Sequence, residues 1–252
     1  MGTITNKVTI FWPKEKVDFL KNNWRLSSRE IAKKLDKQPG DVSGKRKALG
    51  LPFRECDVVP FSFLQRQLVF GSLLGDGSIV RGKEDRNYRF SEAHSIKQKD
   101  YLLFKHEKLK PFSGKFISYP RKDGGRDVKF STKAHPIFKE FRNQFYNNRG
   151  VKIVQNQSLK KIRHPLALAM WFGDDGNKEK DSYRIATGAY TVLEIKRLIK
   201  WLKNQFGVKS YLHKHGKYWY LSIREDRRKF TKLINPFLPK SLHYKLFQLH
   251  GR

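Results

Sequence analysis

The sequence has little of what several common classes of protein require. Its single cysteine, Cys56, excludes an intramolecular disulfide and any cysteine-rich zinc site. The longest unbroken apolar run, Leu166 to Phe172, is far too short to cross a bilayer. Residues 1–7 lack the apolar core of a signal peptide. We therefore expect a soluble, intracellular protein that does not insert into a membrane.

Acidic residues are also scarce. The chain has 54 Lys and Arg against 23 Asp and Glu, which gives a formal net charge of +31. Basic side chains are spread along the whole chain, which argues against a single basic membrane-surface helix and favours a polyanionic partner. With 19 Phe, 10 Tyr and 5 Trp, the chain has the aromatic content of a folded protein. These numbers predict a folded nucleic-acid-binding protein.

The N-terminal region, residues 12–50, has the pattern of three short helices. Apolar residues at helical spacing run from Trp12 to Trp24, Ser27 and Glu30 form a capping box, and Pro39 begins the third helix. This layout resembles a small helix-turn-helix module, and its third helix carries the expected DNA contacts Lys45, Arg46 and Lys47. The alternative is a helical cap packed on the main domain. Residues 1–50 form this module, and 51–60, with two prolines, form the linker.

The rest of the chain divides into two similar halves, 61–155 and 156–252. Each begins with an apolar helix that ends in Asp-Gly, at Asp76-Gly77 and at Asp175-Gly176. The order predicted for each half is helix, two strands, helix, two strands, helix, with strands at 88–91 and 183–186, helices near 99–110 and 191–205, hairpins around 114–133 and 208–224, and closing helices near 135–147 and 227–235.

Strand alternation predicts one apolar sheet face and one polar, basic and aromatic face. Trp219, Leu221 and Ile223 alternate with Tyr218 and Tyr220, and 127–131 alternates in the same way. A polar sheet face with few carboxylates suits contact with DNA bases and phosphates. The expected contacts in this part of the chain are Arg89, Lys129, Arg184, Lys214, Tyr218, Tyr220 and Arg224.

The two Asp-Gly segments are the strongest chemical motif. A carboxylate at the end of an apolar helix is costly to bury unless it is paired or binds a metal. One instance would be typical of an ordinary helix end, with the glycine allowing a left-handed exit. Two instances at equivalent places in a repeated unit favour a metal site. A Walker-type loop, a zinc-enzyme pair of histidines and a nucleophile elbow are all absent from the sequence.

The segments FGSLLGDGS and MWFGDDGN resemble the two motifs of a monomeric LAGLIDADG homing endonuclease. The flanking segments YRFSEAHSIKQKDYLLFKHEKLKPF, HKHGKYWYLSI and INPFLPKSLHYKL resemble the intron-encoded branch, so the resemblance covers roughly residues 61–250. It implies an α+β fold of two pseudo-symmetric αββαββα units that form a DNA-binding saddle. It also implies metal-dependent cleavage of both strands that leaves 3′ overhangs.

By this resemblance, Asp76 and Asp175 each ligate a divalent cation, which we expect to be Mg²⁺. The carbonyl oxygens of Gly75 and Asp174 would be nearby ligands, and we expect the Asp174 side chain to be an exposed second carboxylate. The family also places basic or polar helpers after the second strand and after the last helix of each unit. Candidates are His94 and Lys97 for the first place, and Lys152 and Lys240 for the second.

Two alternatives remain open at this stage. The same fold serves as a group I intron maturase, which would bind intron RNA without cutting DNA. The second alternative is a transcription regulator with a degenerate version of the fold. Such a regulator would be expected to lose the motif acids, whereas this chain has both of them.

Overall fold

The structure, a computed structural model, describes residues 11–82 and 86–248. The chain separates into two compact parts, residues 1–60 and 61–252, which we call the N-terminal module and the main body. Among the described residues, no helix is both long and apolar enough to cross a membrane.

The N-terminal module consists of three short helices around a small apolar core. Ser27 caps the second helix in a capping box with Glu30, as the sequence predicts. The core is formed by Leu20, Ile31 and Val42, with smaller neighbours around them. The elements are α1 (Lys14–Asn22), α2 (Ser28–Leu35), α3 (Pro39–Ala48) and the 3-10 turn η1 (Glu55–Asp57).

Arg46 does not point outward from α3, so its expected role as a DNA contact has to be corrected. Its side chain is fully buried, and its guanidinium donates to the carbonyl oxygens of Leu26 at 2.9 Å, Pro52 at 2.6 Å and Trp24. These carbonyls satisfy a charge that would otherwise be costly to bury. Arg46 therefore holds the module together, while Lys47 is exposed and Lys45 is half-buried.

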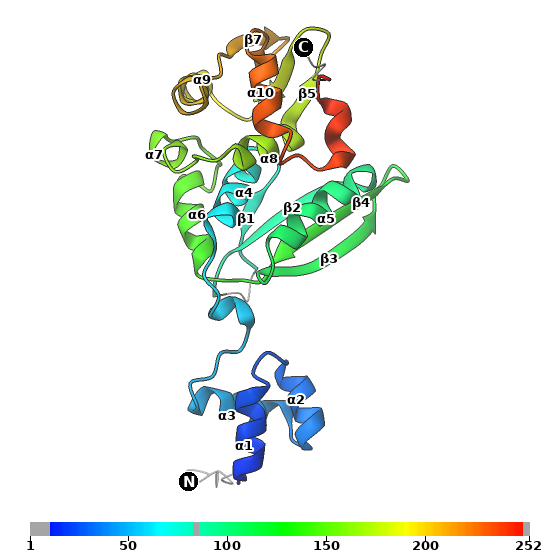
Figure 1. The fold of residues 1–252 in the computed structure, drawn as a ribbon, viewed down its shortest axis with the longest axis vertical. Helices are drawn as coiled ribbons and strands as arrows, with labels where there is room; N and C mark the ends of the chain where they lie inside the picture. Colours follow the sequence, from blue (N-terminus) through cyan, green and yellow to red (C-terminus); the bar gives the residue numbers. More distant parts are fainter. Residues whose placement is uncertain (1–10, 83–85, 249–252) are drawn as a thin grey trace. The chain divides into compact units, whose positions relative to one another are not determined.

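The main body contains two copies of one arrangement, which we call the first and second repeats (Figure 1). Each follows the predicted order of helix, two strands, helix, two strands and helix. The first repeat consists of α4 (Phe63–Leu74), β1 (Ser78–Val80), β2 (Arg89–Ser95), η2 (Ile96–Gln98), α5 (Lys99–Lys108), β3 (Ser113–Pro120), β4 (Arg126–Thr132) and α6 (Ile137–Phe145). The second consists of α7 (Asn156–Leu159), α8 (Pro165–Asp175), β5 (Gly176–Lys178), β6 (Tyr183–Ala186), α9 (Val192–Phe206), β7 (Tyr211–His215), β8 (Tyr218–Ile223), α10 (Arg227–Ile234) and η3 (Lys240–Lys245).

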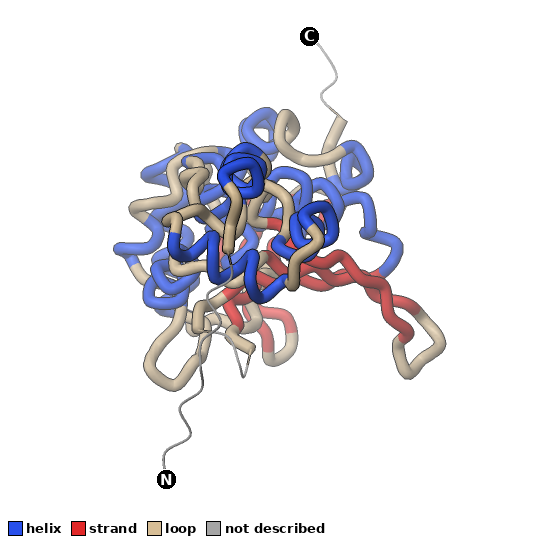
Figure 2. Tube along the Cα trace, turned by 90° about the horizontal axis from the view of Figure 1, so that it is seen from below, coloured by secondary structure: helices blue, strands red, loops and turns tan. Residues whose placement is uncertain are grey.

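Each repeat folds into a four-stranded antiparallel sheet, with the strand orders β1-β2-β4-β3 and β5-β6-β8-β7. Figure 2 shows the strands gathered on one side of the main body, with most of the helices on the other. The alternation predicted for β4 is present, because Val128 and Phe130 are buried while Lys129 is half-exposed. The chain therefore has the α+β fold that the sequence predicts, with one face of each sheet left uncovered by these helices.

Helices α4 and α8 pack against each other at the centre of the main body (Figure 1). A Cβ atom on Gly71 would lie 2.7 Å from the Cα atom of Ala167, so only glycine allows this approach. Gly173 instead faces the Tyr101 ring of the first repeat. The packing is asymmetric, as the unequal glycine spacings of the two motifs indicate.

The glycines that end the motifs have a different role from the one expected. Neither Gly77 nor Gly176 has a positive φ. A Cβ atom on Gly77 would lie 2.6 Å from the Phe90 ring and 2.7 Å from the Ser72 carbonyl oxygen. Close packing, rather than a left-handed exit from the helix, requires glycine here.

Candidate active site

The acids of the two motifs lie at the ends of the packed helices, in slightly different backbone settings. Helix α4 ends at Leu74, so Asp76 lies beyond it, whereas α8 continues through Asp175. The Asp76 side chain is half-exposed. Asp175 is more enclosed, and burial raises its pKa to about 8, with the charges of Asp174 and Asp76 adding to the effect. An enclosed acid whose charge is disfavoured by neighbouring carboxylates is suited to hold a cation.

Asp174 lies beside them, and the expectation for its side chain was wrong. The carboxylate is fully buried rather than exposed. Its Oδ1 atom accepts hydrogen bonds from Lys105 Nζ and from the Tyr101 hydroxyl, each at 2.7 Å, and its Oδ2 accepts one from the Asp76 amide at 3.3 Å. The carboxylate extends into the first repeat because Gly75 leaves room for it: a Cβ atom on Gly75 would lie 2.6 Å from the Asp174 Cβ atom.

Lys105 is the centre of a buried charge cluster in the first repeat, formed by Glu92, His94, Tyr101, Lys105 and Asp174. Its ammonium lies 2.6 Å from Glu92 Oε1, which also lies 2.6 Å from His94 Nε2. His94 Nδ1 faces the carboxylate of Asp76 at 3.7 Å. Sequence reasoning placed His94 at this site and named Asp174 for its carbonyl oxygen, but it missed Glu92, Tyr101 and Lys105.

The charges of this cluster shift one another's pKa in different directions. Burial raises the pKa of Asp174, and the nearby charge of Glu92 raises it further. At Glu92, burial is outweighed by the attraction of Lys105 and His94, so its pKa is lowered. Burial favours the neutral His94 ring, but the hydrogen bond and charge of Glu92 outweigh it and raise the pKa. The cluster thus holds a buried lysine and a histidine that tends to stay protonated.

One group of potential metal ligands contains Asp76, His94 and Asp174, whose ligand atoms lie within 4.8 Å of one another. Within this group, the buried Asp174 oxygen is already held by Lys105 and Tyr101, and His94 Nε2 is held by Glu92. Asp76 is therefore its most accessible carboxylate.

Two lysines bind carbonyl oxygens near the ends of the motifs. Lys152 Nζ donates to the carbonyl oxygens of Gly75 at 2.7 Å and Gly77 at 2.8 Å, while Lys245 Nζ donates to Gly173 at 2.7 Å. Burial lowers the pKa of both lysines, although the nearby acids oppose this effect. Lys152 was among the candidates from the sequence, and Lys245 was not.

The other basic candidates lie in different places. Lys240, at the start of η3, is exposed, and the lysine that reaches a motif is Lys245, at the end of the same element. Lys97 is exposed in η2. Spacing alone makes Lys240 and Lys245 equally plausible as the lysine that reaches the motif. Only the path of the chain through η3 distinguishes them.

The uncovered sheet faces carry most of the expected DNA contacts. Arg184 lies with its guanidinium 4.2 Å from the centre of the Tyr220 ring, and Arg89 and Lys129 are half-exposed on the first sheet. Tyr218 and Arg224 are exposed in the second repeat.

Lys214 differs from its prediction, because it pairs with Trp219 and so shares the face of the apolar residues. His213 and His215, which pair with Tyr220 and Tyr218, occupy the polar face instead. The alternation of β7 could have indicated this, had its register with β8 been known.

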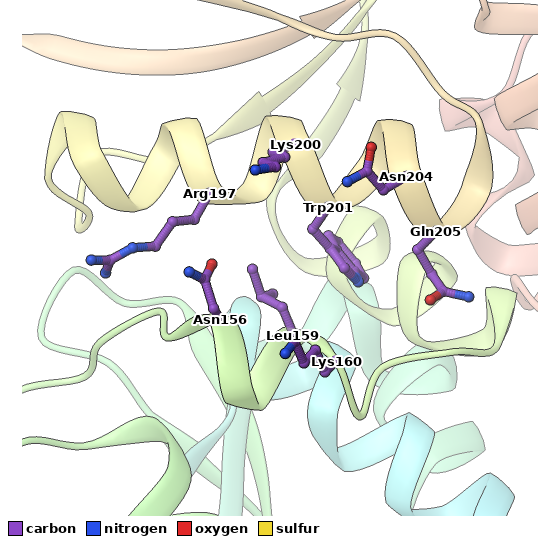
Figure 3. Close-up of a pocket in the computed structure, with 8 residues that line it drawn as sticks. All are labelled: Asn156, Leu159, Lys160, Arg197, Lys200, Trp201, Asn204 and Gln205. Carbon is purple, nitrogen blue, oxygen red and sulfur yellow. The ribbon is translucent and has the colours of Figure 1, made fainter.

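A separate groove of about 340 Å³ lies between α7 and α9, where Trp201 and Leu159 face each other (Figure 3). Its lining includes Lys160, Arg197 and Lys200 but no acidic residue. It therefore lacks the carboxylates that lie at the ends of the two motifs.

Comparison with known proteins agrees with this geometry. Cytochrome b mRNA maturase bI2 of Debaryomyces hansenii is 30% identical over 191 residues, which cover 71% of this chain and 72% of the maturase. DNA endonuclease I-ChuI of Chlamydomonas applanata is 30% identical over 205 residues, which cover 72% of this chain and 94% of the endonuclease. The chain also matches RecA proteins of Mycolicibacterium, of whose length it spans about half (51%).

The fold has a counterpart among solved structures. The homing endonuclease I-WcaI bound to its DNA recognition sequence is 22% identical, with a TM-score of 0.69 over 77% of this chain and 90% of that chain. The LAGLIDADG DNA endonuclease family matches residues 66–230, which include both motifs and both sheets. This chain therefore belongs to the LAGLIDADG DNA endonuclease family.

Proposed function

We propose that this protein is a homing-type endonuclease that cuts both strands of DNA at a specific site, with divalent metal, and leaves 3′ overhangs. The observation that carries the proposal is the pair of motif carboxylates, Asp76 and Asp175, at the ends of the two packed helices. The reaction class, cleavage of DNA, comes from the family to which the chain belongs.

The residues present suit Mg²⁺. This ion prefers oxygen ligands and keeps several waters, so few protein groups are needed. Asp76 and Asp175 would hold it through their carboxylates, with the carbonyl oxygens of Gly75 and Asp174 nearby. The raised pKa of Asp175 reflects a buried acid without enough positive charge around it, which a divalent cation would supply. A divalent ion held by these carboxylates would supply activation of water and stabilisation of the departing 3′ oxygen.

The chain's own groups would hold the ends of the motifs and the phosphates in place. Lys152 and Lys245 bind carbonyl oxygens of the motifs and add positive charge beside the acids. His94 lies against Asp76 and restrains its carboxylate. Lys97 and Lys240 are both exposed, and the role that we propose for them is contact with DNA phosphates.

The DNA would lie along the uncovered sheet faces. Arg89, Lys129, Arg184 and Arg224 supply positive charge, and each phosphate that they neutralise releases a condensed counterion. Tyr218 and Tyr220 add aromatic surface, and the half-exposed position of Tyr220 leaves it available for contact.

The N-terminal module would add a second contact with DNA. We propose that α3 is its DNA-contacting helix, with Lys47 and Lys45 at phosphates and Arg46 as the internal support of the module. Such a module would lengthen the recognised site or add affinity that does not depend on sequence.

The test is cleavage of a randomised DNA library by the purified protein with Mg²⁺. Specific double-strand cuts with 3′ overhangs are expected from the unchanged chain. Asp100→Asn, a matched change of an exposed acid in α5, should retain them. DNA that is bound but remains intact with Mg²⁺ or Mn²⁺ would refute the proposal.

One observation favours a second function: the 30% identity to the Debaryomyces hansenii cytochrome b mRNA maturase. A maturase role would need binding of structured intron RNA through the same basic surface. Competition of a group I intron RNA with target DNA tests it, and accelerated splicing without DNA cleavage would make this the principal function.

A further inference from the structure

The two repeats can be aligned residue by residue through their sheets. Ser78 follows the first motif and pairs with Ser91, while Asn177 follows the second and pairs with Arg184. Ser91 therefore corresponds to Arg184. One and three residues further along each strand, Glu92 corresponds to Ile185 and His94 corresponds to Thr187.

The following helices keep the same alignment. Four buried positions of each helix have matching spacings: Tyr101, Leu102, Lys105 and Leu109 in the first repeat, and Glu194, Ile195, Leu198 and Leu202 in the second, where Trp201 and Phe206 are buried as well. The spacings are identical, so Lys105 corresponds to Leu198. At the motifs themselves, the residue before each terminal Asp is Gly75 in the first and Asp174 in the second.

Every charged member around Lys105 thus has an uncharged counterpart. Glu92 and Lys105 are matched by Ile185 and Leu198, both fully buried. Asp174 is matched by Gly75, which has no side chain. Packing of the helix on the sheet therefore does not require the charges, because the second repeat achieves it with apolar residues. Buried ion clusters are often no more stable than apolar ones of similar size.

The cluster contacts Asp76, whereas among the residues that the structure describes the counterparts of these groups make no such contacts with Asp175. Asp174 accepts a hydrogen bond from the Asp76 amide at 3.3 Å, and His94 Nδ1 faces the Asp76 carboxylate at 3.7 Å. In the second repeat, the hydroxyl of Thr187 donates to the carbonyl oxygen of Trp219 at 2.9 Å, within its own sheet. Both the main chain and the side chain of Asp76 are therefore restrained by groups that have no equivalent beside Asp175.

We infer that the buried charge cluster of Glu92, His94, Tyr101, Lys105 and Asp174 positions Asp76 for cleavage of one DNA strand, while Asp175 acts on the other strand without such a device. The inference rests on the proposed endonuclease function. His94, Lys105 and Glu92 are positioning residues in this account: Lys105 fixes Glu92 and Asp174, and these in turn hold His94 and the Asp76 main chain. Loss of the cluster should slow one strand selectively.

The experiment measures the cleavage rate of each strand separately. The substrate is a duplex carrying the site recovered from the library, with a different fluorescent label on each strand, and Mg²⁺ starts the reaction. His94→Ala is compared with Thr187→Ala, its counterpart in the second repeat. The triple variant Glu92→Ile, Lys105→Leu, Asp174→Asn is compared with Leu198→Met. The triple variant removes the charges of Glu92, Lys105 and Asp174 together, so that none of these three is left buried without its partner.

The ratio of the two strand rates is the readout, because a general defect in folding or DNA binding slows both strands equally. We expect both His94→Ala and the triple variant to slow the same strand, changing the ratio by about tenfold or more, since misplaced catalytic groups cost rate steeply. Thr187→Ala and Leu198→Met should leave the ratio unchanged. Affinity for the same duplex with Ca²⁺ should be equal in all five proteins.

Two other results have distinct meanings. If the unchanged protein cuts but the ratio stays constant in the folded His94→Ala and triple variants, the cluster is only structural and the inference is overturned. If the unchanged protein cuts neither strand, the proposed function fails and the inference fails with it.

Discussion

The first and second repeats have the same strand order and the same helix order, but their interiors differ in charge at a matched place between the second strand and the helix that follows it. In the first repeat this place holds Glu92 and Lys105, both buried. In the second it holds Ile185 and Leu198. A fold can therefore keep its backbone symmetry while one half exchanges apolar packing for buried charges. The comparison teaches that backbone likeness between the repeats does not imply equal chemistry at their acids.

The largest expected effect tests what the repeats share. Asp76→Asn and Asp175→Asn each remove one motif carboxylate, and each should lower cleavage of at least one strand by at least about a hundredfold, because a metal-held carboxylate is lost. Strand-resolved cleavage with Mg²⁺ measures this. Full activity on both strands in either variant would mean that the acid removed is not required for cleavage.

The next effect concerns the stability of the two interiors. Lys105→Met leaves Glu92 and Asp174 buried without their shared cation, which should lower the free energy of unfolding by about 3–5 kcal/mol. The counterpart change, Leu198→Met, conserves volume and should cost less than about 1.5 kcal/mol. Urea unfolding of the two variants measures the difference, and equal losses would contradict the contrast between the repeats.

A third prediction uses pH to separate the two acids. The pKa of Asp175 is raised to about 8 from 3.8, so the folded protein holds a proton that the unfolded chain releases. This group therefore stabilises the metal-free fold at low pH, and that contribution is lost as pH rises between these values. Because a cation needs the ionised carboxylate, metal affinity should increase over the same range.

Thermal unfolding and Mn²⁺ titration at several pH values test this prediction. Asp175→Asn should reduce the fall in metal-free stability between pH 4 and pH 8, the range between the usual and raised pKa values. An unchanged slope in Asp175→Asn would assign the pH dependence to another group, such as those of the buried charge cluster.

The smallest effect concerns the outer faces, where we expect the repeats to be alike. Lys129→Ala in the first sheet and Arg184→Ala in the second should each lower the slope of log affinity against log salt by about 1, since each removes one phosphate contact. DNA affinity measured over a range of NaCl concentrations, without divalent metal, gives the slopes. A change in only one variant would extend the asymmetry from the interior to the surface.

Periodicity and motif spacing predict the architecture well. The two apolar motif helices, the alternation in 127–131 and the capping box at Ser27 all depend on local sequence, and the structure has each of them, although α4 ends at Leu74, before its Asp-Gly. The boundaries are less certain from sequence: the strand expected at 88–91 extends to Ser95 as β2. Its last residues carry Glu92 and His94, so the shorter prediction left part of the buried charge cluster outside a strand.

Contacts between residues distant in sequence account for what was missed. Asp174 looks like a surface carboxylate because its partners, Lys105 and Tyr101, lie in the other repeat. In the sequence, Arg46 looks like a DNA contact because it lies between Lys45 and Lys47. The carbonyl groups that it binds come from outside its helix. A usable signal existed in α5, where Lys105 falls on the same helical face as Leu102 and Leu109.

The fit between Gly75 and the Asp174 side chain also limits how the repeats can be recombined. A dimer of two first repeats would bring two copies of Gly75 together, leaving each Lys105 without the carboxylate that Asp174 supplies. A dimer of two second repeats would place two Asp174 carboxylates at the shared axis with Leu198 in place of each lysine. Pairing either half with a copy of itself would therefore change the charge balance at this point, with one partner fewer for each lysine in the first case and two neighbouring carboxylates in the second.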